Sequence, residues 1–239
     1  MHAPPRQSIV LLFLAALALA GGGFWWAGQR QGAAATPGVY VALGASDAVG
    51  VGADRPERDG WVPLVQAGLP PGTQLVNLGV SGATLGDVLA AQLPVALDAR
   101  PRWVTLWPGV NDLRDGVALD TFAGQLDTLL GRLAGAPGAT VVVLNIPDLR
   151  VLPAFAGVDH AQLDATVHQW NAVIADAARR HGALLVDLYA GWRELAAHPE
   201  YVSADGFHPS SAGYRRIADF ALAALKAHER ASSGAWRRV

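Results

Sequence analysis

Five short apolar segments, rich in strand-forming residues, recur along this chain at intervals of about 30–40 residues. Between them, apolar residues recur every three or four positions, as on one face of a helix, most clearly over residues 119–133, 163–177 and 214–225. Strands that alternate with helices are typical of a parallel sheet covered on both faces. The pattern predicts an α/β fold: a three-layer α/β/α sandwich with a five-stranded parallel, flavodoxin-like sheet. The five segments are Val39–Leu43, Gln74–Leu78, Trp103–Trp107, Thr140–Asn145 and Ala183–Leu188.

Length and composition bound the number of domains and the partners. A chain of 239 residues suits one α/β domain with terminal extensions. We expect the domain over residues 39–228, a linker over 31–38 and a flexible tail over 229–239, and we expect a monomer. The net charge of −2 gives no reason to expect nucleic-acid binding. The absence of cysteine excludes a disulfide framework and a thiolate metal site.

Residues 1–30 have the layout of a secretory signal peptide. Arg6 precedes an apolar stretch that begins at Ile9, and Ala18-Leu19-Ala20 forms a cleavage site followed by glycines. A membrane anchor is the alternative, because the uncharged stretch over residues 9–28 covers about 20 positions, enough to cross a bilayer. Under either interpretation the domain is exported, to a secreted, periplasmic or other extracytoplasmic location, and only the second interpretation attaches it to a membrane.

A glycine-rich loop follows the first predicted strand, in the segment VALGASDAVGVG (residues 41–52). Ligands of doubly wound sheets lie at the carboxyl ends of the strands, so this loop is a candidate site. It lacks the Lys-Ser/Thr pair of a phosphate-binding P-loop, and its glycines do not have dinucleotide-binding spacing. Two interpretations of Ser46 remain, a helix cap and a nucleophile.

The segment DGFHP, after the fifth predicted strand, favours the nucleophile. A serine needs a base within hydrogen-bond reach, and the base needs an acid that orients it. Asp205 and His208 lie three positions apart in one loop, where the carboxylate can reach the imidazole. Asp-Gly is also a common turn signal, so a plain turn is the competing interpretation. The other histidines show no metal-ligand spacing, and we expect neither a metal nor another cofactor.

Acyl transfer also requires hydrogen-bond donors for an oxyanion. Asn111 follows the third predicted strand, and its side-chain amide is one candidate donor. The backbone N–H groups of Gly82 and Ser46 are the others. Taken singly, an asparagine after a glycine is a common turn or cap residue, and Gly82 is a common helix-entry residue.

The segments that contain Ser46, Gly82, Asn111 and His208 follow one another in this order along the chain. Together they resemble the SGNH/GDSL hydrolase superfamily over residues 39–228. VALGASDAVGVGA resembles the first motif of that family, NLGVSGAT the second, GVND the third and DGFHP the last. The stretch RPRWVTLWPGVND is similar to the secreted thioesterase/lysophospholipase-type (GDSL esterase) branch. The resemblance implies a catalytic triad of Ser46, Asp205 and His208, and an oxyanion hole formed by Ser46, Gly82 and Asn111.

One motif departs from the family pattern. Where the family has Gly-Asp-Ser, this chain has Gly44-Ala45-Ser46, with an acid moved to Asp47. The missing acid has none of the triad roles, so the assignment of Ser46 stands. The substitution nevertheless leaves a non-catalytic binding domain as an alternative of another class. The α/β-hydrolase fold is a rival enzyme interpretation, disfavoured because here Asp205 and His208 share one loop.

The function expected from the resemblance is that of a serine esterase acting on small-molecule carboxylic esters or thioesters with short to medium acyl chains. A carbohydrate O-acetylesterase and a lysophospholipase are alternatives on the same fold.

The loop IPDLRVLPAFAGVD (residues 146–159) is unusually apolar for an exposed connection. The apolar residues of this loop either pack on the core or form an acyl slot together with Trp107. They are Leu149, Val151, Leu152 and Phe155.

Overall fold

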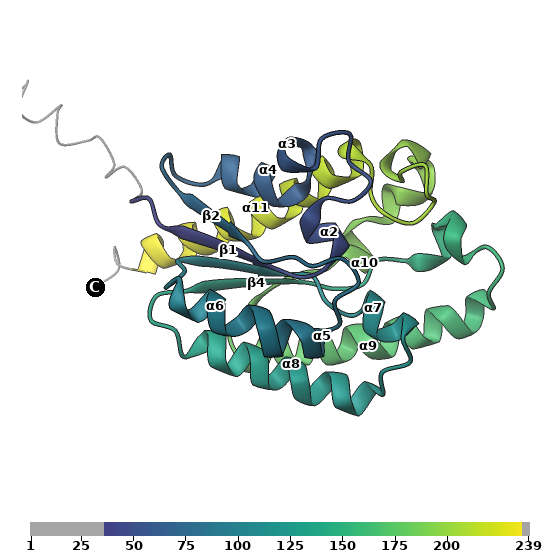
Figure 1. The fold of residues 1–239 in the computed structure, drawn as a ribbon, viewed down its shortest axis with the longest axis horizontal. Coiled ribbons are helices and arrows are strands. Elements are labelled where there is room, and N and C mark those ends of the chain that lie inside the picture. Colours follow the sequence, from purple (N-terminus) through teal and green to yellow (C-terminus); the bar gives the residue numbers. More distant parts are fainter. Residues whose placement is uncertain (1–35, 236–239) are drawn as a thin grey trace, which may run out of the picture. The chain divides into compact units, whose positions relative to one another are not determined.

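Five parallel strands form the sheet on which the rest of the domain is built (Figure 1). The computed structural model describes residues 36–235. Within them the sheet has the order β2-β1-β3-β4-β5, which is the flavodoxin-like order, so the predicted fold class is confirmed. The register places Val39 opposite Gln74 and Tyr40 opposite Trp103. The strands are β1 (Val39–Leu43), β2 (Gln74–Asn77), β3 (Trp103–Leu106), β4 (Thr140–Leu144) and β5 (Leu184–Val186).

Helices cover both faces of the sheet (Figure 1). On one face α4 (Trp61–Gly68) packs against α11 (Ser211–Ala235), and on the other face α8 (Leu119–Ala134) packs against α9 (His160–Arg180). The three apolar stripes of the sequence are the buried faces of α8, α9 and α11. Burial of apolar area against the sheet is the main stabilising contribution of these helices.

Shorter helices occupy the connections, and most of them lie near the carboxyl ends of the strands. They are α2 (Ser46–Val49), α3 (Pro56–Asp59), α5 (Leu85–Asp87), the π-helix η1 (Val88–Gln92), α6 (Leu93–Asp98), α7 (Val110–Arg114), the 3-10 turns η2 (Leu149–Val151) and η3 (Pro153–Phe155), α10 (Leu188–Gly191), and the 3-10 turns η4 (Arg193–Ala197) and η5 (Pro199–Tyr201).

Four of the five strands end earlier than the sequence pattern predicts, and the difference is largest in β5. Leu188, predicted to be in the strand, is the first residue of α10. The side chain of Asn145 explains this end, because its Oδ1 atom accepts hydrogen bonds from the N–H groups of Leu188 at 2.7 Å and Tyr189 at 3.2 Å. The start of α10 therefore binds to the end of β4 through a side chain instead of extending the sheet.

The terminal segments expected from the sequence lie only partly within the described residues. Helix α11 continues to Ala235, so residues 229–235 are helical where a flexible tail was expected. The expected signal peptide or anchor over residues 1–30, and most of the expected linker, lie outside the described residues. No helix within residues 36–235 is long and apolar enough to cross a membrane.

Candidate active site

The first turn after β1 presents Ser46 at the start of α2, at the carboxyl edge of the sheet. Gly44 reaches this turn with a φ of 146°, a conformation that favours glycine. The buried side chain of Gln92 holds the same residue on both sides. Its Oε1 atom accepts from the N–H of Gly44 at 3.0 Å, and its Nε2 atom donates to the carbonyl of Gly44 at 2.9 Å. Gln92 is therefore a positioning residue for the turn that presents Ser46, a role that no sequence motif predicted.

Ser46 and His208 are 162 residues apart in the chain and meet at the edge of the sheet. The Nε2 atom of His208 lies 2.8 Å from Ser46 Oγ, and its Nδ1 atom lies 2.6 Å from Asp205 Oδ2. The structure thus brings together the three residues that the sequence analysis named as a triad. In this arrangement an imidazole can remove the proton of the serine hydroxyl while a carboxylate fixes its orientation.

Asp205 is held as a carboxylate by a set of donors. Its Oδ1 atom accepts from the hydroxyl of Ser203 at 2.7 Å and from the N–H groups of Phe207 at 2.8 Å and His208 at 2.9 Å. Burial alone would raise the pKa of Asp205, but the hydrogen bonds from His208, Phe207 and Ser203 outweigh it and hold the pKa well below its usual range. Asp205 is therefore ionised at neutral pH and can stabilise a charged imidazole.

Two contacts hold the segment after Ser46 in place, one against the loop of His208 and one against α11, which follows that loop. A Cβ atom on Gly52, whose φ is 94°, would lie 2.6 Å from the carbonyl oxygen of Pro209 and 3.0 Å from His208 Cβ, so only glycine allows this approach. The hydroxyl of the buried Tyr214 donates to the carbonyl of Val51 at 2.7 Å. These contacts set the distance between Ser46 and His208.

Three groups near Ser46 can donate to an oxyanion. Within residues 36–235, the N–H groups of Ser46 and Gly82 make no hydrogen bond. Gly82 has a φ of 83°, and a Cβ there would meet no atom within 4 Å, so the backbone conformation and not crowding favours glycine. Asn111 is buried in α7, and its Nδ2 atom donates one hydrogen to the carbonyl of Ala83 at 2.9 Å. Its second Nδ2 hydrogen is available to a substrate.

Asp112, the neighbour of Asn111, ties two of these loops together. Its Oδ1 atom accepts from the N–H of Leu85, at the start of α5, at 2.9 Å. The residue is almost completely buried, and burial raises the pKa of its carboxyl group. Asp112 thus fixes the loop of Ala83 against α7. Asp112 is the last residue of the GVND motif, and the motif alone predicted no role for it.

We expect Asn111→Ala to lower kcat about 10²–10³-fold, which is the usual effect of losing one oxyanion donor. The effect should fall on kcat more than on KM, because the donor acts most strongly on the charge that develops in the transition state. Steady-state kinetics on 4-nitrophenyl acetate measures both constants. A rise in KM with an unchanged kcat would show that Asn111 only binds substrate, and a thermal unfolding curve controls for loss of the bond to Ala83.

Asp47 directly follows Ser46, and its Oδ2 atom is buried without a hydrogen-bond partner in the described part of the chain. Burial raises the pKa of Asp47 to about 7, against the lowering effect of the N–H groups of Asp47, Ala48 and Ala45. The acid that stands one position away from the family pattern is therefore partly protonated near neutral pH.

Asp47→Asn is expected to stabilise the protein at pH 8 and to have little effect at pH 4. In the unfolded chain Asp47 ionises near its ordinary pKa of 3.8, whereas the folded protein keeps the proton up to a pKa of about 7. The folded state binds the extra proton, so stability falls as the pH rises between these values. Each pKa unit corresponds to about 1.4 kcal/mol. Urea unfolding at pH 4, 6 and 8 measures the difference, and equal curves for variant and wild type at every pH would contradict it.

A cavity of about 70 Å³ opens beside Ser46 and His208. Of the five residues expected to form an acyl slot, Trp107, Leu149 and Leu152 line this cavity, whereas Val151 and Phe155 do not. Phe155 packs instead against Phe207, with ring centroids 6.0 Å apart. The apolar lining also includes residues that the motifs did not predict as substrate contacts, among them Leu85, Val88, Trp192, Leu195, Tyr201 and Phe207.

Comparison with known proteins agrees with this geometry. Residues 42–216 match the GDSL-like Lipase/Acylhydrolase family, a span that holds Ser46, Gly82, Asn111, Asp205 and His208. The chain belongs to this family. It is therefore a GDSL hydrolase, an enzyme that cleaves ester bonds, as the sequence motifs predicted.

Three individual proteins similar to this GDSL hydrolase are 28%, 27% and 25% identical to it. An acetylxylan esterase of Geobacillus stearothermophilus is 28% identical over 170 residues, covering 66% of this chain and 74% of the relative. The crystal structure of TesA is 27% identical with a TM-score of 0.62, covering 79% of this chain and 98% of that one. LAE5, an alpha/beta hydrolase enzyme from the metagenome of Lake Arreo in Spain, is 25% identical with a TM-score of 0.64, covering 78% and 94%.

Proposed function

We propose that this GDSL hydrolase is a serine esterase that works through an acyl-enzyme intermediate. The observation that carries the proposal is the chain of contacts from Asp205 to His208 at 2.6 Å and from His208 to Ser46 at 2.8 Å. His208 takes the proton of Ser46 as its Oγ atom attacks the ester carbonyl. The N–H groups of Ser46 and Gly82 and the amide of Asn111 hold the oxyanion.

In the second half of the reaction the proton moves twice through His208. The imidazolium first protonates the leaving alcohol, which leaves the acyl group on Ser46 Oγ. His208 then takes a proton from water as the water attacks the acyl carbonyl, and it returns that proton to Ser46 as the acid leaves. Apart from the ester and the water, the groups that act in these steps are side chains and N–H groups of the chain itself.

The volume of the cavity favours short acyl chains. A water needs about 10–15 Å³ of such a volume, so a cavity of 70 Å³ holds only a few water-sized groups. Its wall is largely apolar, with Leu85, Leu149 and Leu152 among the lining residues. Each buried methylene adds at most about 0.8 kcal/mol, so preference for longer chains should stop where the cavity is full. We propose esters and thioesters of short to medium acyl chains as substrates.

The test is kcat/KM across 4-nitrophenyl esters of two to sixteen carbons. We expect a maximum among the shortest members and a fall beyond them. A steady rise to the longest chain would contradict the proposal and would indicate a lipase or phospholipase with an open groove. Activity that depends on Ser46 but is confined to acetyl esters would favour the carbohydrate O-acetylesterase alternative.

A carbohydrate O-acetylesterase is the second candidate, because the acetylxylan esterase of Geobacillus stearothermophilus is among the relatives of this chain. The apolar cavity beside Ser46 accepts an acetyl group as well as a longer acyl chain.

Export of the enzyme, either by a cleaved signal peptide or with a retained anchor over residues 9–28, is also part of the proposal and rests on the sequence alone. N-terminal sequencing of the protein recovered from secreted and membrane fractions distinguishes the two forms, and recovery from the cytosol would contradict both.

A further inference from the structure

Two leucines of the loop after β4 form part of the wall of the cavity beside Ser46. Leu149 and Leu152 line this cavity and are 2% and 7% exposed. They stand three positions apart across the 3-10 turn η2, and side chains at this spacing in such a turn lie one above the other. A turn of three residues is too short to fix its own position, so the place of these leucines depends on what η2 binds.

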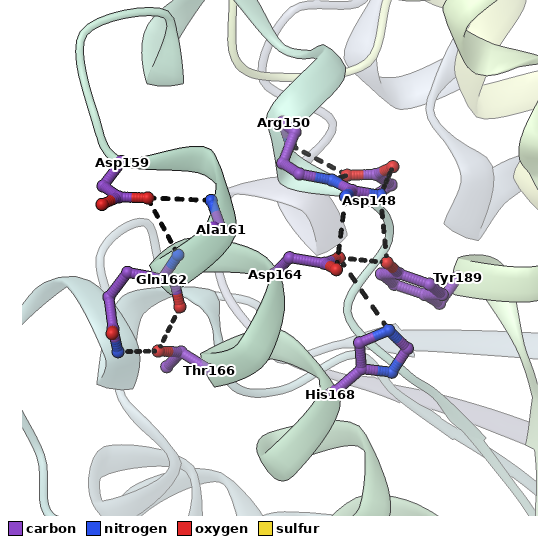
Figure 2. Close-up of polar contacts among 9 residues, drawn as sticks. All are labelled: Asp148, Arg150, Asp159, Ala161, Gln162, Asp164, Thr166, His168 and Tyr189. Carbon is purple, nitrogen blue, oxygen red and sulfur yellow. Dashed lines mark hydrogen bonds and ion pairs between the residues drawn. The ribbon is translucent and has the colours of Figure 1, made fainter.

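Arg150, which lies between the two leucines in the sequence, joins η2 to two helices (Figure 2). Its guanidinium donates to Asp148 at 2.8 and 2.7 Å, and its Nη1 atom lies 3.2 Å from Asp164 of α9. It also donates to the hydroxyl of Tyr189 in α10 at 3.2 Å, and that hydroxyl donates to Asp164. Asp148 accepts from the N–H of Arg150 at 3.0 Å and so caps η2. These bonds tie η2 to α9 and α10.

The geometry of this network differs from that of an ordinary surface ion pair. A single exposed pair contributes little, whereas a two-pronged contact between an arginine and a carboxylate within a network holds its groups in one orientation. The hydrogen bonds with Asp148 raise the pKa of Arg150 above its usual range, and those with Arg150 lower the pKa of Asp148. Both groups are therefore charged near neutral pH, and removal of Arg150 takes away the cation that Asp148 and Asp164 share.

The same loop is held a second time, at η3. The N–H of Ala154 donates to the carbonyl of Gly206 at 3.0 Å, in the loop that contains Asp205 and His208. This bond does not involve Arg150. Loss of the arginine should therefore release η2 while η3 keeps its bond to the loop of His208.

A second cavity lies behind η2. Its volume is about 290 Å³, compared with about 70 Å³ for the cavity beside Ser46. Trp192 and Leu195 line both cavities, so the two are neighbours. Residues of the η2 segment that alternate with the two leucines line the larger cavity: Asp148, Arg150 and Val151. The space behind the leucines can therefore receive them if η2 is released.

We infer that Arg150 is a positioning residue that fixes one wall of the acyl cavity and thereby limits the length of the acyl chain that the enzyme accepts. The inference rests on the proposed esterase function and deepens it, because it names the group that holds this wall. Arg150 does not line the cavity beside Ser46, so it acts through Leu149 and Leu152. Without the network, these leucines move toward the larger cavity and the acyl cavity becomes longer.

The experiment compares Arg150→Ala with the wild type on 4-nitrophenyl octanoate and 4-nitrophenyl acetate, which differ only in the acyl chain. The ratio of kcat/KM for the octanoate to that for the acetate is expected to rise about tenfold, as when about two more methylenes are buried. The rise should appear as a lower KM for the octanoate, because binding of the chain changes and the chemistry does not. Tyr189→Phe removes one hydroxyl from the network and should raise the ratio by a smaller factor. Arg150→Lys should restore part of the wild-type ratio, since it keeps the charge but not the two-pronged contact.

Arg180→Ala is the matched control. Arg180, at the end of α9, also bonds two carboxylates, those of Asp127 and Asp176, and it lines neither cavity. Its loss should leave the ratio unchanged, and an equal rise in Arg180→Ala would overturn the inference, because general loosening of the fold would then explain both results.

The remaining contrary results separate the inference from the proposed function. If the wild type prefers the acetate, and Arg150→Ala and Tyr189→Phe lower thermal stability without changing the ratio, the network only stabilises the fold. The inference is then wrong and the proposed esterase stands. If the wild type prefers the octanoate or hydrolyses neither ester, the proposed function fails and the inference fails with it.

Discussion

Ser46→Ala is expected to lower kcat for 4-nitrophenyl acetate by about 10⁴–10⁶-fold, with the fold retained. The variant loses Ser46 Oγ, which lies 2.8 Å from His208 Nε2, and with it the acyl-enzyme route. The oxyanion donors remain, so a low residual rate is expected. Steady-state kinetics and a thermal unfolding curve measure the two properties.

The matched control is Ser81→Ala, because Ser81 is an exposed serine in the neighbouring loop before Gly82. It should keep nearly all of the activity. Retention of most activity in Ser46→Ala, with loss in Ser81→Ala, would move the nucleophile to the second loop and overturn the assignment.

Asp205→Asn is expected to lower kcat about 10⁴-fold. The asparagine oxygen can still accept from the N–H groups of Phe207 and His208, so the loop should keep its conformation. Its amide nitrogen, however, would face His208 Nδ1 as a donor in place of Asp205 Oδ2, now 2.6 Å away. The imidazole then carries its proton on Nε2 and cannot accept the proton of Ser46.

Asp98→Asn is the control for this loss of charge. Asp98 is an exposed acid at the end of α6, and it lines neither cavity. Its substitution should leave kcat unchanged. A loss smaller than tenfold in Asp205→Asn would mean that the carboxylate does not set the tautomer of His208.

The sequence predicted the sheet and the place of the catalytic candidates well. Strand-forming runs separated by helical periodicity fix the number of strands and their parallel direction, and the site of such a sheet lies at its carboxyl edge. The motifs around Ser46 and His208 then fall at that edge, where the structure joins them over 162 residues of sequence.

The sequence predicted less where one side chain decides the local structure. Gln92 has no motif of its own, and its role depends on two bonds to Gly44 that only the packed helix creates. Asn145 ends β4 and starts α10 through its amide oxygen, a contact that strand propensities do not predict. Trp192 lies between α10 and η4, and Leu195 lies in η4. Both line the cavity beside Ser46 from a segment too short to show periodicity, so tertiary packing positions them.

A fluorophosphonate tests most directly whether Ser46 is the activated nucleophile, because it forms a stable bond with a serine that an adjacent base has activated. The protein is incubated with the reagent and digested, and the modified peptide is sequenced by mass spectrometry. We predict one adduct, on Ser46, which is absent from Ser46→Ala and forms far more slowly in Asp205→Asn. An adduct on Ser81 or another residue, or ester hydrolysis that continues at full rate after Ser46 is modified, would contradict the assignment.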